Sequence, residues 1–469
     1  MRNGYSTHSN GVNGHSNGFH VAKGELSKST IADLPWQRVS YKLLFSLFVS
    51  VPVVAMYAMG LPWWTYPGLF LVGLLPVFLG FIVTYNYISL RGQANSSPGL
   101  IGKYIEFRDK GLGEKYATRK MPFESLLEAY ADESVDFKGD VLEALEKRQH
   151  FSTSELTWNH LKIFCCNFLP ELLSHSRMQD LDQVRDHYDR GNDFYEAFLG
   201  PMMVYTAGIL REKGESLEQL QENKLTLLFE KIGLKPGDKH LDIGCGWGTL
   251  VNFAADKRGT KSTGISISKN QVEWARDVAN KRGLEDNANF MCIDYRDIPH
   301  DSYDKVTCLE MAEHVGVLHF QSFLCQVRDL MKDDGVFFLQ IAGLRRAWQW
   351  EDFVWGLFMD KYIFPGADAS CPLAVVIQQL EAAGFEIANV ETIGIHYSYT
   401  IHRWYQNWVR PSTKEAICAK YGTRLYRIWE IFLAWSTIIA RQGSSTCFQI
   451  VCHKNLNEYD RSKYFHIKD

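Results

Sequence analysis

The sequence predicts an α/β domain on a mostly parallel, Rossmann-like sheet, with apolar helices and a helical segment in front of it. Three observations carry this prediction. A glycine-rich turn follows a short apolar strand at 239–248, strands and helices alternate from about Leu225 to Ile393, and two apolar runs lie at 41–59 and 66–85. Alternating strands and helices form parallel sheets with helices on both faces.

Composition narrows the class of function. The 469-residue chain has a net charge of −4, which argues against non-specific binding of nucleic acid. The 10 cysteines are scattered, only Cys165 and Cys166 are adjacent, and no CxxC pair indicates zinc. We therefore expect reduced thiols, no metal and no nucleic-acid partner.

The first element is a predicted disordered, cytosolic N-terminus over residues 1–40. Its first part, up to Lys23, is rich in Gly, Asn, Ser and His and offers almost nothing to bury. It also lacks the short apolar run and small-residue cleavage site of a signal peptide.

The two apolar runs predict a transmembrane helical hairpin over residues 41–86. Each run is close to the roughly 20 residues that a helix needs to span a bilayer. Pro62 ends the first helix, and Trp63 and Trp64 suit a membrane interface. Basic residues on both outer flanks favour two cytosolic ends. The alternative is a helical pair buried in a soluble core.

Residues 87–190 predict a helical lead-in that connects the hairpin to the following domain. Phe123, Leu126, Leu127 and Tyr130 fall at positions i, i+3, i+4 and i+7, which places them on one face of a helix. Charged residues fill much of the remaining surface, as is usual for a solvated face.

The domain at 191–469 is expected to contain five successive strands. They are predicted at 239–242, 262–267, 289–293, 305–309 and 336–341, with helices such as 271–282 and 319–331 between them. A further apolar strand at 447–452 is expected to close the edge of the sheet. Ligands of such sheets bind at the carboxyl ends of the strands.

The turn after the first strand points to one class of ligand. Asp242 precedes Gly244, Gly246 and Gly248, and glycines at such a turn let a ligand approach the backbone. A dinucleotide site would read G-x-G-x-x-G and present a helix N-terminus to a pyrophosphate. The G-x-G-x-G spacing better suits a ligand without phosphate whose cationic end lies near Asp242, such as S-adenosylmethionine. The alternative is an ordinary glycine-rich turn.

Several stretches together resemble one family. Residues 187–195, His-Tyr-Asp-Arg-Gly-Asn-Asp-Phe-Tyr, resemble the HYDxGNDFY segment of cyclopropane fatty acid synthases and mycolic acid methyltransferases. Further matching stretches are Tyr205-Thr206, Asp242 to Gly248, Gly264 to Gln271, Asp294 to Asp297, Glu313 to Gly316, Tyr362 to Gly366 and His396 to Thr400. With the two apolar runs in front, the architecture is similar to the fungal sphingolipid 9-methyltransferases.

The resemblance implies a class I S-adenosylmethionine-dependent methyltransferase. It implies methyl transfer to the alkene carbon at position 9 of the sphingoid base of an unsaturated glucosylceramide, with the double bond kept. It also implies an integral membrane protein of the endoplasmic reticulum, with its catalytic domain facing the cytosol and C-terminal lipid-binding helices. The alternatives are cyclopropane synthesis on phospholipid acyl chains, and binding of lipid or cofactor without turnover.

The resemblance also implies a set of cofactor-binding residues, several with a chemical reason of their own. Most such folds bind the ribose hydroxyls with an acid after the second strand. This sequence has serines there, so hydroxyl and amide groups would bind the ribose instead. The ring of Tyr295 can stack on adenine. The implied residues are Tyr205, Thr206, Asp242, Gly244, Cys245, Gly246, Trp247, Gly248, Ser266, Ile267, Ser268, Asn270, Gln271, Tyr295 and Arg296.

Methylation of an alkene leaves a carbocation, so the site must stabilise a cation, exclude water and remove one proton. The resemblance implies Glu313 and Tyr397 as catalytic residues, and the position of His314 favours a structural role. Aromatic rings stabilise cations, and one dense aromatic run could do so or could equally be core. Its members are Trp348, Trp350, Phe353, Trp355, Phe358 and Tyr362.

The chain departs from the cyclopropane synthases at the positions that hold their bicarbonate base. Their cysteine, histidine and isoleucine at this site are replaced by Ala207, Gln340 and Ala342, and a C-terminal cysteine by Ser436. These losses argue against bicarbonate binding. They favour a product that keeps its double bond, with the proton leaving the methylated carbon itself.

Overall fold

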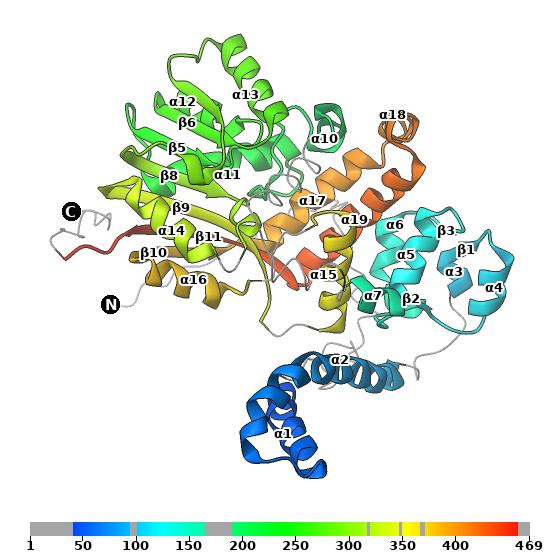
Figure 1. Cartoon of the computed structure of the whole chain (residues 1–469). Coiled ribbons are helices and arrows are strands. Elements are labelled where there is room, and N and C mark those ends of the chain that lie inside the picture. The colour runs from blue at the N-terminus through cyan, green and yellow to red at the C-terminus, as the bar shows by residue number, and fades with distance from the viewer. Residues whose placement is uncertain are drawn as a thin grey trace, which may run out of the picture.

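The structure is a computed structural model that describes residues 41–93, 101–163, 166, 190–316, 319–346, 349–365 and 371–457. The predicted disordered N-terminus at 1–40 lies outside these ranges, as do residues 187–189 and Trp348 of the motifs above. Figure 1 shows the arrangement of the elements.

A seven-stranded sheet forms the centre of the domain, in the order β10-β11-β9-β8-β5-β6-β7. Strands β5 to β9 pair in parallel, as predicted. The five predicted strands are confirmed to within a few residues, except that β9 is longer. The strands are β5 (Lys239–Ile243), β6 (Lys261–Ser266), β7 (Ala288–Cys292), β8 (Tyr303–Leu309), β9 (Met331–Leu344), β10 (Phe385–Thr392) and β11 (Ser445–Lys454).

The strand predicted at 447–452 exists as β11, but its expected place at the edge of the sheet is wrong. Phe448 lies opposite Ile341 of β9 on one side and opposite Thr392 of β10 on the other, and both pairings are antiparallel. The edge is β10, which the sequence pattern did not predict. Most of its residues are partly or fully exposed, so it lacks the apolar run by which a buried strand is found.

Helices cover both faces of this sheet. Phe337 belongs to the apolar core shared with α14 (Phe320–Asp329) and α16 (Leu373–Ala382). The next residue, Phe338, points to the opposite face. It belongs to the core shared with α11 (Leu217–Ile232) and α12 (Thr249–Arg258). Helix α13 (Lys269–Arg282) packs beside α12 over β6 and β7.

A second core, rich in aromatic residues, joins the C-terminal helices to the lead-in. Four tryptophans at its centre are almost fully buried: Trp404, Trp408, Trp429 and Trp435. Its helices are α10 (Asn192–Leu199), α15 (Trp350–Tyr362), α17 (Gly394–Trp408), α18 (Pro411–Tyr421) and α19 (Thr423–Arg441).

The predicted helical lead-in is mostly helical but also contains two small sheets, β1 with β3 and β2 with β4. Helix α5 (Phe123–Ala131) places Phe123, Leu126, Leu127 and Tyr130 in the aromatic core, as its periodicity predicts. The other elements are α3 (Ile101–Tyr104), β1 (Ile105–Phe107), α4 (Lys110–Tyr116), β2 (Met121–Pro122), β3 (Val135–Phe137), α6 (Val141–Glu146), β4 (Ser152–Thr153) and α7 (Trp158–Ile163).

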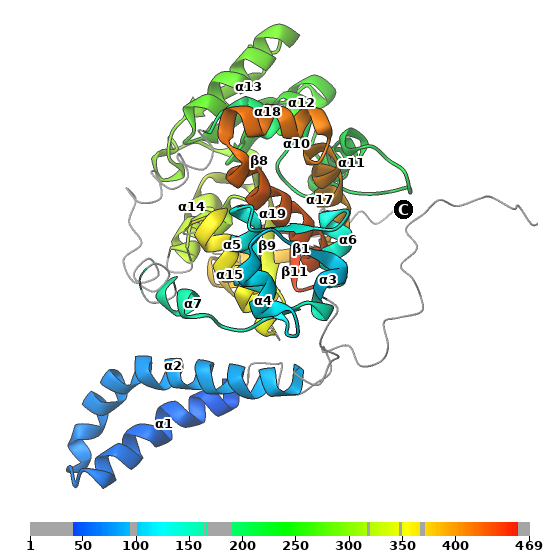
Figure 2. The ribbon, with the colours of Figure 1, turned by 90° about the vertical axis from the view of Figure 1, so that its right-hand side faces the viewer.

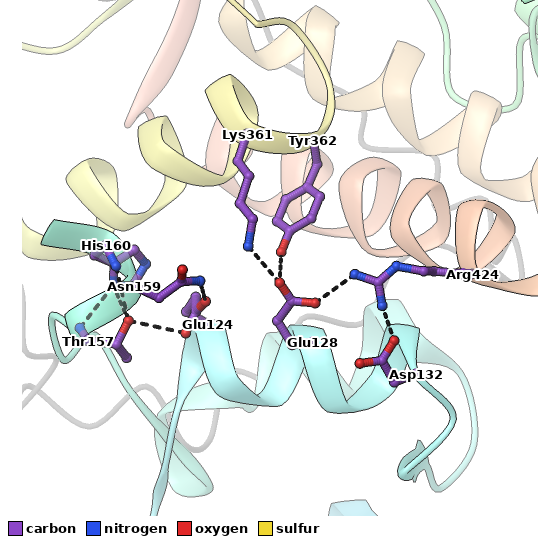
Figure 3. A network of polar contacts seen from close by, with 9 residues as sticks. All are labelled: Glu124, Glu128, Asp132, Thr157, Asn159, His160, Lys361, Tyr362 and Arg424. Carbon is purple, nitrogen blue, oxygen red and sulfur yellow. Dashed lines mark hydrogen bonds and ion pairs between the residues drawn. The ribbon is translucent and has the colours of Figure 1, made fainter. Parts of the chain in front are cut away.

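The polar side of α5 binds three other helices (Figure 3). Glu128 accepts hydrogen bonds from Lys361 Nζ at 2.6 Å, from the Tyr362 hydroxyl, and from Arg424 Nη2 at 2.8 Å. One turn earlier, Glu124 accepts from Asn159 and from Thr157 Oγ1, the latter at 3.2 Å. Polar and charged contacts therefore hold α5 to α7 within the lead-in and to α15 and α19 of the following domain, in addition to apolar packing.

The apolar runs form α1 (Tyr41–Ala58) and α2 (Tyr66–Gln93), which lie side by side beneath the rest of the molecule (Figure 2). A short turn at Trp63–Thr65 links them. Phe81 and Ile82 of α2 pack against Trp350, and Asn86 Nδ2 donates to the Ser154 carbonyl at 3.3 Å. In the described ranges, one helix, Trp63–Ile88, is long and apolar enough to cross a membrane. Two spans therefore remain a prediction.

Candidate active site

Three glycines shape the turn after β5, each for its own reason. Gly244, Gly246 and Gly248 have φ values of +80°, +54° and +76°, a region that favours glycine. A Cβ on Gly244 would lie 2.5 Å from Met311, and one on Gly248 would lie 2.5 Å from Ala275. A Cβ on Gly246 would meet nothing within 4 Å. The outer two glycines are thus required by packing, whereas Gly246 borders open space.

That space is a cavity at the carboxyl ends of β5 to β8. Most of the predicted cofactor residues line it: Tyr205, Thr206, Asp242, Gly244, Cys245, Gly246, Trp247, Ser266, Ile267, Gln271, Tyr295 and Arg296. The other three, Gly248, Ser268 and Asn270, are not part of its lining. Gly248 packs against α13 and β7. Ser268 caps α13, because its hydroxyl accepts a hydrogen bond from the main-chain N–H of Gln271 at 3.4 Å.

Two opposite charges face the cavity. Asp242 accepts a hydrogen bond from Thr307 Oγ1 at 2.6 Å, and burial raises the pKa of its carboxyl to about 6. Lys224 of α11 donates to Thr206 Oγ1 at 2.6 Å, and burial lowers its pKa to about 8. The sequence reading missed Lys224. Its signal was a lysine on the buried face of α11, one turn after Leu220 and one before Leu228.

Hydrogen bonds within the protein hold the polar side chains that follow β6 and β7 in place. Ser266 Oγ donates to Gln271 Oε1 at 2.8 Å, which fixes the amide that lines the cavity. Asp294, a lining residue outside the predicted set, accepts from Arg296 Nε at 2.8 Å and Nη2 at 2.9 Å. Hydrogen-bonding groups that follow β6 and β7 therefore line the cavity together with the Tyr295 ring.

A further carboxylate, Glu310, lines the cavity at the end of β8 and was also missed. Its Oε1 accepts from the Ala207 amide at 2.9 Å and from Gln340 Nε2 at 2.6 Å. Its Oε2 accepts from the Tyr397 hydroxyl at 2.9 Å. Its φ of +51° is rare outside glycine. The sequence feature that could have identified Glu310 is an acidic residue directly after an apolar strand.

The two predicted catalytic residues lie behind the lining rather than in it. Tyr397 is absent from the lining, and its hydroxyl donates to Glu310, which belongs to it. Glu313 Oε1 accepts from the Ala342 amide at 2.5 Å, and its Oε2 is buried without a hydrogen-bond partner among the described residues. Burial, and then the charge of Glu310, raise the pKa of Glu313 to about 8. His314, whose position favours a structural role, does line the cavity.

The buried members of the aromatic run, Trp350, Trp355 and Phe358, lie in the protein core. Trp355 and Phe358 pack against Trp435 of α19, with ring centroids 4.9 and 5.5 Å apart, and Trp350 packs against α2. Aromatic lining of the cavity comes instead from Tyr205, Trp247 and Tyr295.

The residues that line the cavity suit S-adenosylmethionine. Open space above Gly246 leaves room for a ligand against the backbone. Asp242 offers a carboxylate to a cationic centre, and Tyr295, Gln271 and Asp294 offer a ring and polar groups to a nucleoside. Within the described ranges, no group of three or more His, Cys, Asp or Glu side chains could hold a metal ion.

Comparison with known proteins gives one consistent result. The mycolic acid cyclopropane synthetase family model matches residues 175–450. The sphingolipid C9-methyltransferase of Komagataella phaffii is 48% identical over 438 residues, covering 90% of this chain and 89% of that protein. Sphingolipid C9-methyltransferase 2 of Gibberella zeae is 54% identical over 364 residues, covering 76% and 70%. Among solved structures, the cyclopropane synthase MmaA2 from Mycobacterium tuberculosis matches with a TM-score of 0.55 at 24% identity, over 58% of this chain and 98% of that one, which shows a shared fold.

Proposed function

Because the chain belongs to the mycolic acid cyclopropane synthetase family, and within it to the sphingolipid C9-methyltransferases, we propose that it methylates carbon 9 of the sphingoid base of a sphingolipid. The methyl donor is S-adenosylmethionine, which when bound supplies an electrophilic methyl group on a sulfonium centre. The observation that carries the proposal is the turn at Asp242–Gly248, which opens at Gly246 onto a cavity with an acid beside it.

Each part of the cavity has a role in this reaction. Gly246 leaves the backbone accessible, and Asp242 favours the positive end of the donor electrostatically. Gln271 and Asp294 offer hydrogen bonds to the nucleoside, and the Tyr295 ring offers a face to the base. The buried aromatic core beside the cavity helps to exclude water, which would otherwise trap the carbocation as an alcohol.

Glu313 and Tyr397 are proposed to act as positioning residues, since neither lines the cavity. Tyr397 orients Glu310 through its hydroxyl. With a pKa of about 8, Glu313 is mostly protonated at neutral pH, so it contributes a neutral carboxyl beside the Ala342 amide.

The lipid substrate is proposed to be an unsaturated glucosylceramide that reaches the site from a membrane. Large apolar side chains on α1, α2 and their link are exposed to an unusual degree, among them Tyr57 at 88%, Trp63 at 78% and Val72 at 76%. Exposed apolar surface of this extent marks a membrane or protein interface. We place the protein in the membrane of the endoplasmic reticulum, with α1 and α2 as a hairpin and the catalytic domain in the cytosol.

The test is methyl transfer from labelled S-adenosylmethionine by the full chain in detergent micelles. The lipids compared are an unsaturated glucosylceramide, the same lipid without its sugar, its saturated counterpart and a monounsaturated phospholipid. We expect only the unsaturated sphingolipids to gain one CH2, with the alkene retained by NMR and the glucosylated lipid preferred. A ring formed on the phospholipid would identify a cyclopropane synthase. Cofactor binding without any product would identify a non-catalytic homologue.

A further inference from the structure

We propose that Glu310 is the base that removes the proton from the methylated carbon, and that Tyr397, Gln340 and the Ala207 amide hold its carboxylate in place for this step. The inference rests on the proposed function, because the proton in question arises only when an alkene is methylated.

The place of Glu310 is the first argument. It lines the same cavity as Gly244, Gly246 and Asp242, so the residue borders the space assigned to the methyl donor. Its backbone holds a φ of +51°, which an L-residue rarely adopts. Strained conformations of this kind persist where the surroundings fix them, and they cluster at active sites.

The second argument is the set of donors around the carboxylate. A main-chain N–H, a side-chain amide and a phenol all donate to its two oxygens, at 2.9, 2.6 and 2.9 Å. The Cys447 thiol lies 3.6 Å from Oε1 as a weak further donor. A set made only of donors suits an ionised carboxylate, which accepts and does not donate.

The third argument concerns the direction of the Gln340 amide, which could in principle present either its oxygen or its NH2 group. Gln449 Nε2 donates to Gln340 Oε1 at 2.9 Å, and Gln449 in turn accepts from Lys231 Nζ at 2.7 Å. These two hydrogen bonds orient the side-chain oxygen of Gln340 toward Gln449, and its NH2 group therefore faces Glu310. Ala207 and Gln340 are also two of the positions at which the sequence departs from the bicarbonate ligands of cyclopropane synthases. A carboxylate of the chain itself lies against both.

The step balances without an oxidant or reductant. The electron pair of the alkene forms the new bond to the methyl carbon, and the C–S bond of the sulfonium breaks, leaving its pair on sulfur. The neighbouring carbon becomes a cation. Glu310 then takes the proton from the methylated carbon, and the C–H electron pair restores the double bond between the same two carbons. Removal of a proton from the new methyl group instead would close a ring.

The experiment removes the carboxylate and then supplies one. Glu310→Gly suits the φ of this residue and vacates the space between the donors. Glu310→Gln keeps the volume without the charge. We expect both variants to bind S-adenosylmethionine within about twofold of the parent and to lose about 100-fold or more in turnover, as for other positioned bases. Millimolar formate should restore turnover in Glu310→Gly but not in Glu310→Gln.

The matched control is Glu133→Gly in the lead-in. Glu133 has a φ of +62°, so the change makes the same backbone replacement away from the cavity, and turnover should be unchanged. A substrate deuterated at carbon 9 gives a second readout. Glu310→Asp, which withdraws the carboxylate by one methylene, should show a larger isotope effect on turnover than the parent.

The outcomes separate the two proposals. A parent protein that methylates no unsaturated sphingolipid would overturn the proposed function and this inference together. An active parent with full turnover in Glu310→Gln would overturn the inference alone. So would a folded, cofactor-binding Glu310→Gly whose lost turnover no small carboxylate restores.

Discussion

Gly246 and Gly283 have nearly the same backbone torsion, with φ values of +54° and +65°, yet their surroundings differ. A Cβ would meet nothing within 4 Å at either position. Gly283, however, only ends α13, whereas Gly246 lines the cavity. This pair separates the effect of backbone strain from that of filling the site.

Gly246→Ala should therefore lose affinity for S-adenosylmethionine by about tenfold or more, because its methyl group enters the space of the ligand. Gly283→Ala should keep that affinity. Both should lose a similar free energy of unfolding, about 1–2 kcal/mol, from the left-handed torsion. Titration calorimetry and thermal unfolding measure the two effects. Equal cofactor affinity in both variants would contradict the assignment of the cavity.

Glu313 predicts a dependence of stability on pH. Its pKa is raised to about 8 in the folded protein from a usual value of 4.5, so the folded state binds the proton more tightly. Its contribution to stability is complete below pH 4.5 and decreases as the pH rises toward 8. Glu313→Gln removes this decrease. The melting temperature of the variant minus that of the parent should therefore increase as the pH rises from 6 to 9. If this difference stays constant across that range, Glu313 is not a buried neutral carboxyl.

Among single residues, those that belong to a local sequence motif could be predicted as site residues. Those whose role depends on partners far away in the chain could not. The turn at Asp242–Gly248 could be predicted because its glycines and acid are adjacent in the chain. Glu310 contacts Ala207, Gln340 and Tyr397, which come from different parts of the sequence. No spacing rule connects them before the sheet and α17 are folded.

Among the elements, α5 shows how the lead-in is fixed to the domain (Figure 3). Although burial raises the pKa of Glu128, hydrogen bonds from Lys361, Tyr362 and Arg424 lower it to about 2. The stabilisation is therefore present above pH 4.5, the usual value, and is lost as the pH falls toward 2.

Glu128→Gln should accordingly lower the free energy of unfolding at pH 7 by about 1–3 kcal/mol, in the range of hydrogen bonds to a charged group. The loss should shrink as the pH falls from 4.5 toward 2. The exposed Glu114 lies outside this network, so Glu114→Gln is a control that should have little effect at either pH. Urea unfolding followed at several pH values measures both. A loss that does not change with pH would show that Glu128 acts by packing and not by charge.

Elements with a strong apolar pattern could be predicted, and those without one could not. Most residues of β5, β6, β8 and β9 are buried, whereas β7, at the other edge of the sheet, alternates the buried Ala288 and Phe290 with the exposed Asn289. Strand β10 is half exposed and gives no such signal. The apolar run of β11 predicted a strand, but the partners of Phe448 in β10 and β9, Thr392 and Ile341, lie 56 and 107 residues earlier in the chain, and periodicity carries no information on pairing at that range.

For the whole molecule, the exposed α1–α2 pair is the part that we propose to contact the membrane. Leu71 and Val72 of α2 are 68% and 76% exposed, and they are not among the residues that pack with Trp350. A charge near the centre of a membrane helix costs about 2.5–3.5 kcal/mol on insertion scales. Surface positions in contact with water tolerate the same charge.

The double change Leu71→Arg and Val72→Arg should release a large part of the protein from membranes on washing with carbonate, while the parent remains bound. Ile395→Arg, on an exposed position of α17, is the matched control and should stay bound like the parent. Tags at the two ends of the chain count the spans: the same side of the membrane for a hairpin, opposite sides if α2 alone crosses. Full release of the parent by carbonate would exclude a spanning helix.

The position of β11 has a consequence for how the sheet is completed during protein synthesis. Strand β10 leaves the ribosome well before β11, which is its one strand neighbour among the described residues. Until residues 393–444 and then β11 have been synthesised, β9 and β10 both present unpaired edges, which are open to association with other chains. A premature stop in that interval would thus yield a nascent polypeptide that has its nucleotide-type turn but no finished sheet. Such a product is a natural client for chaperones and for degradation.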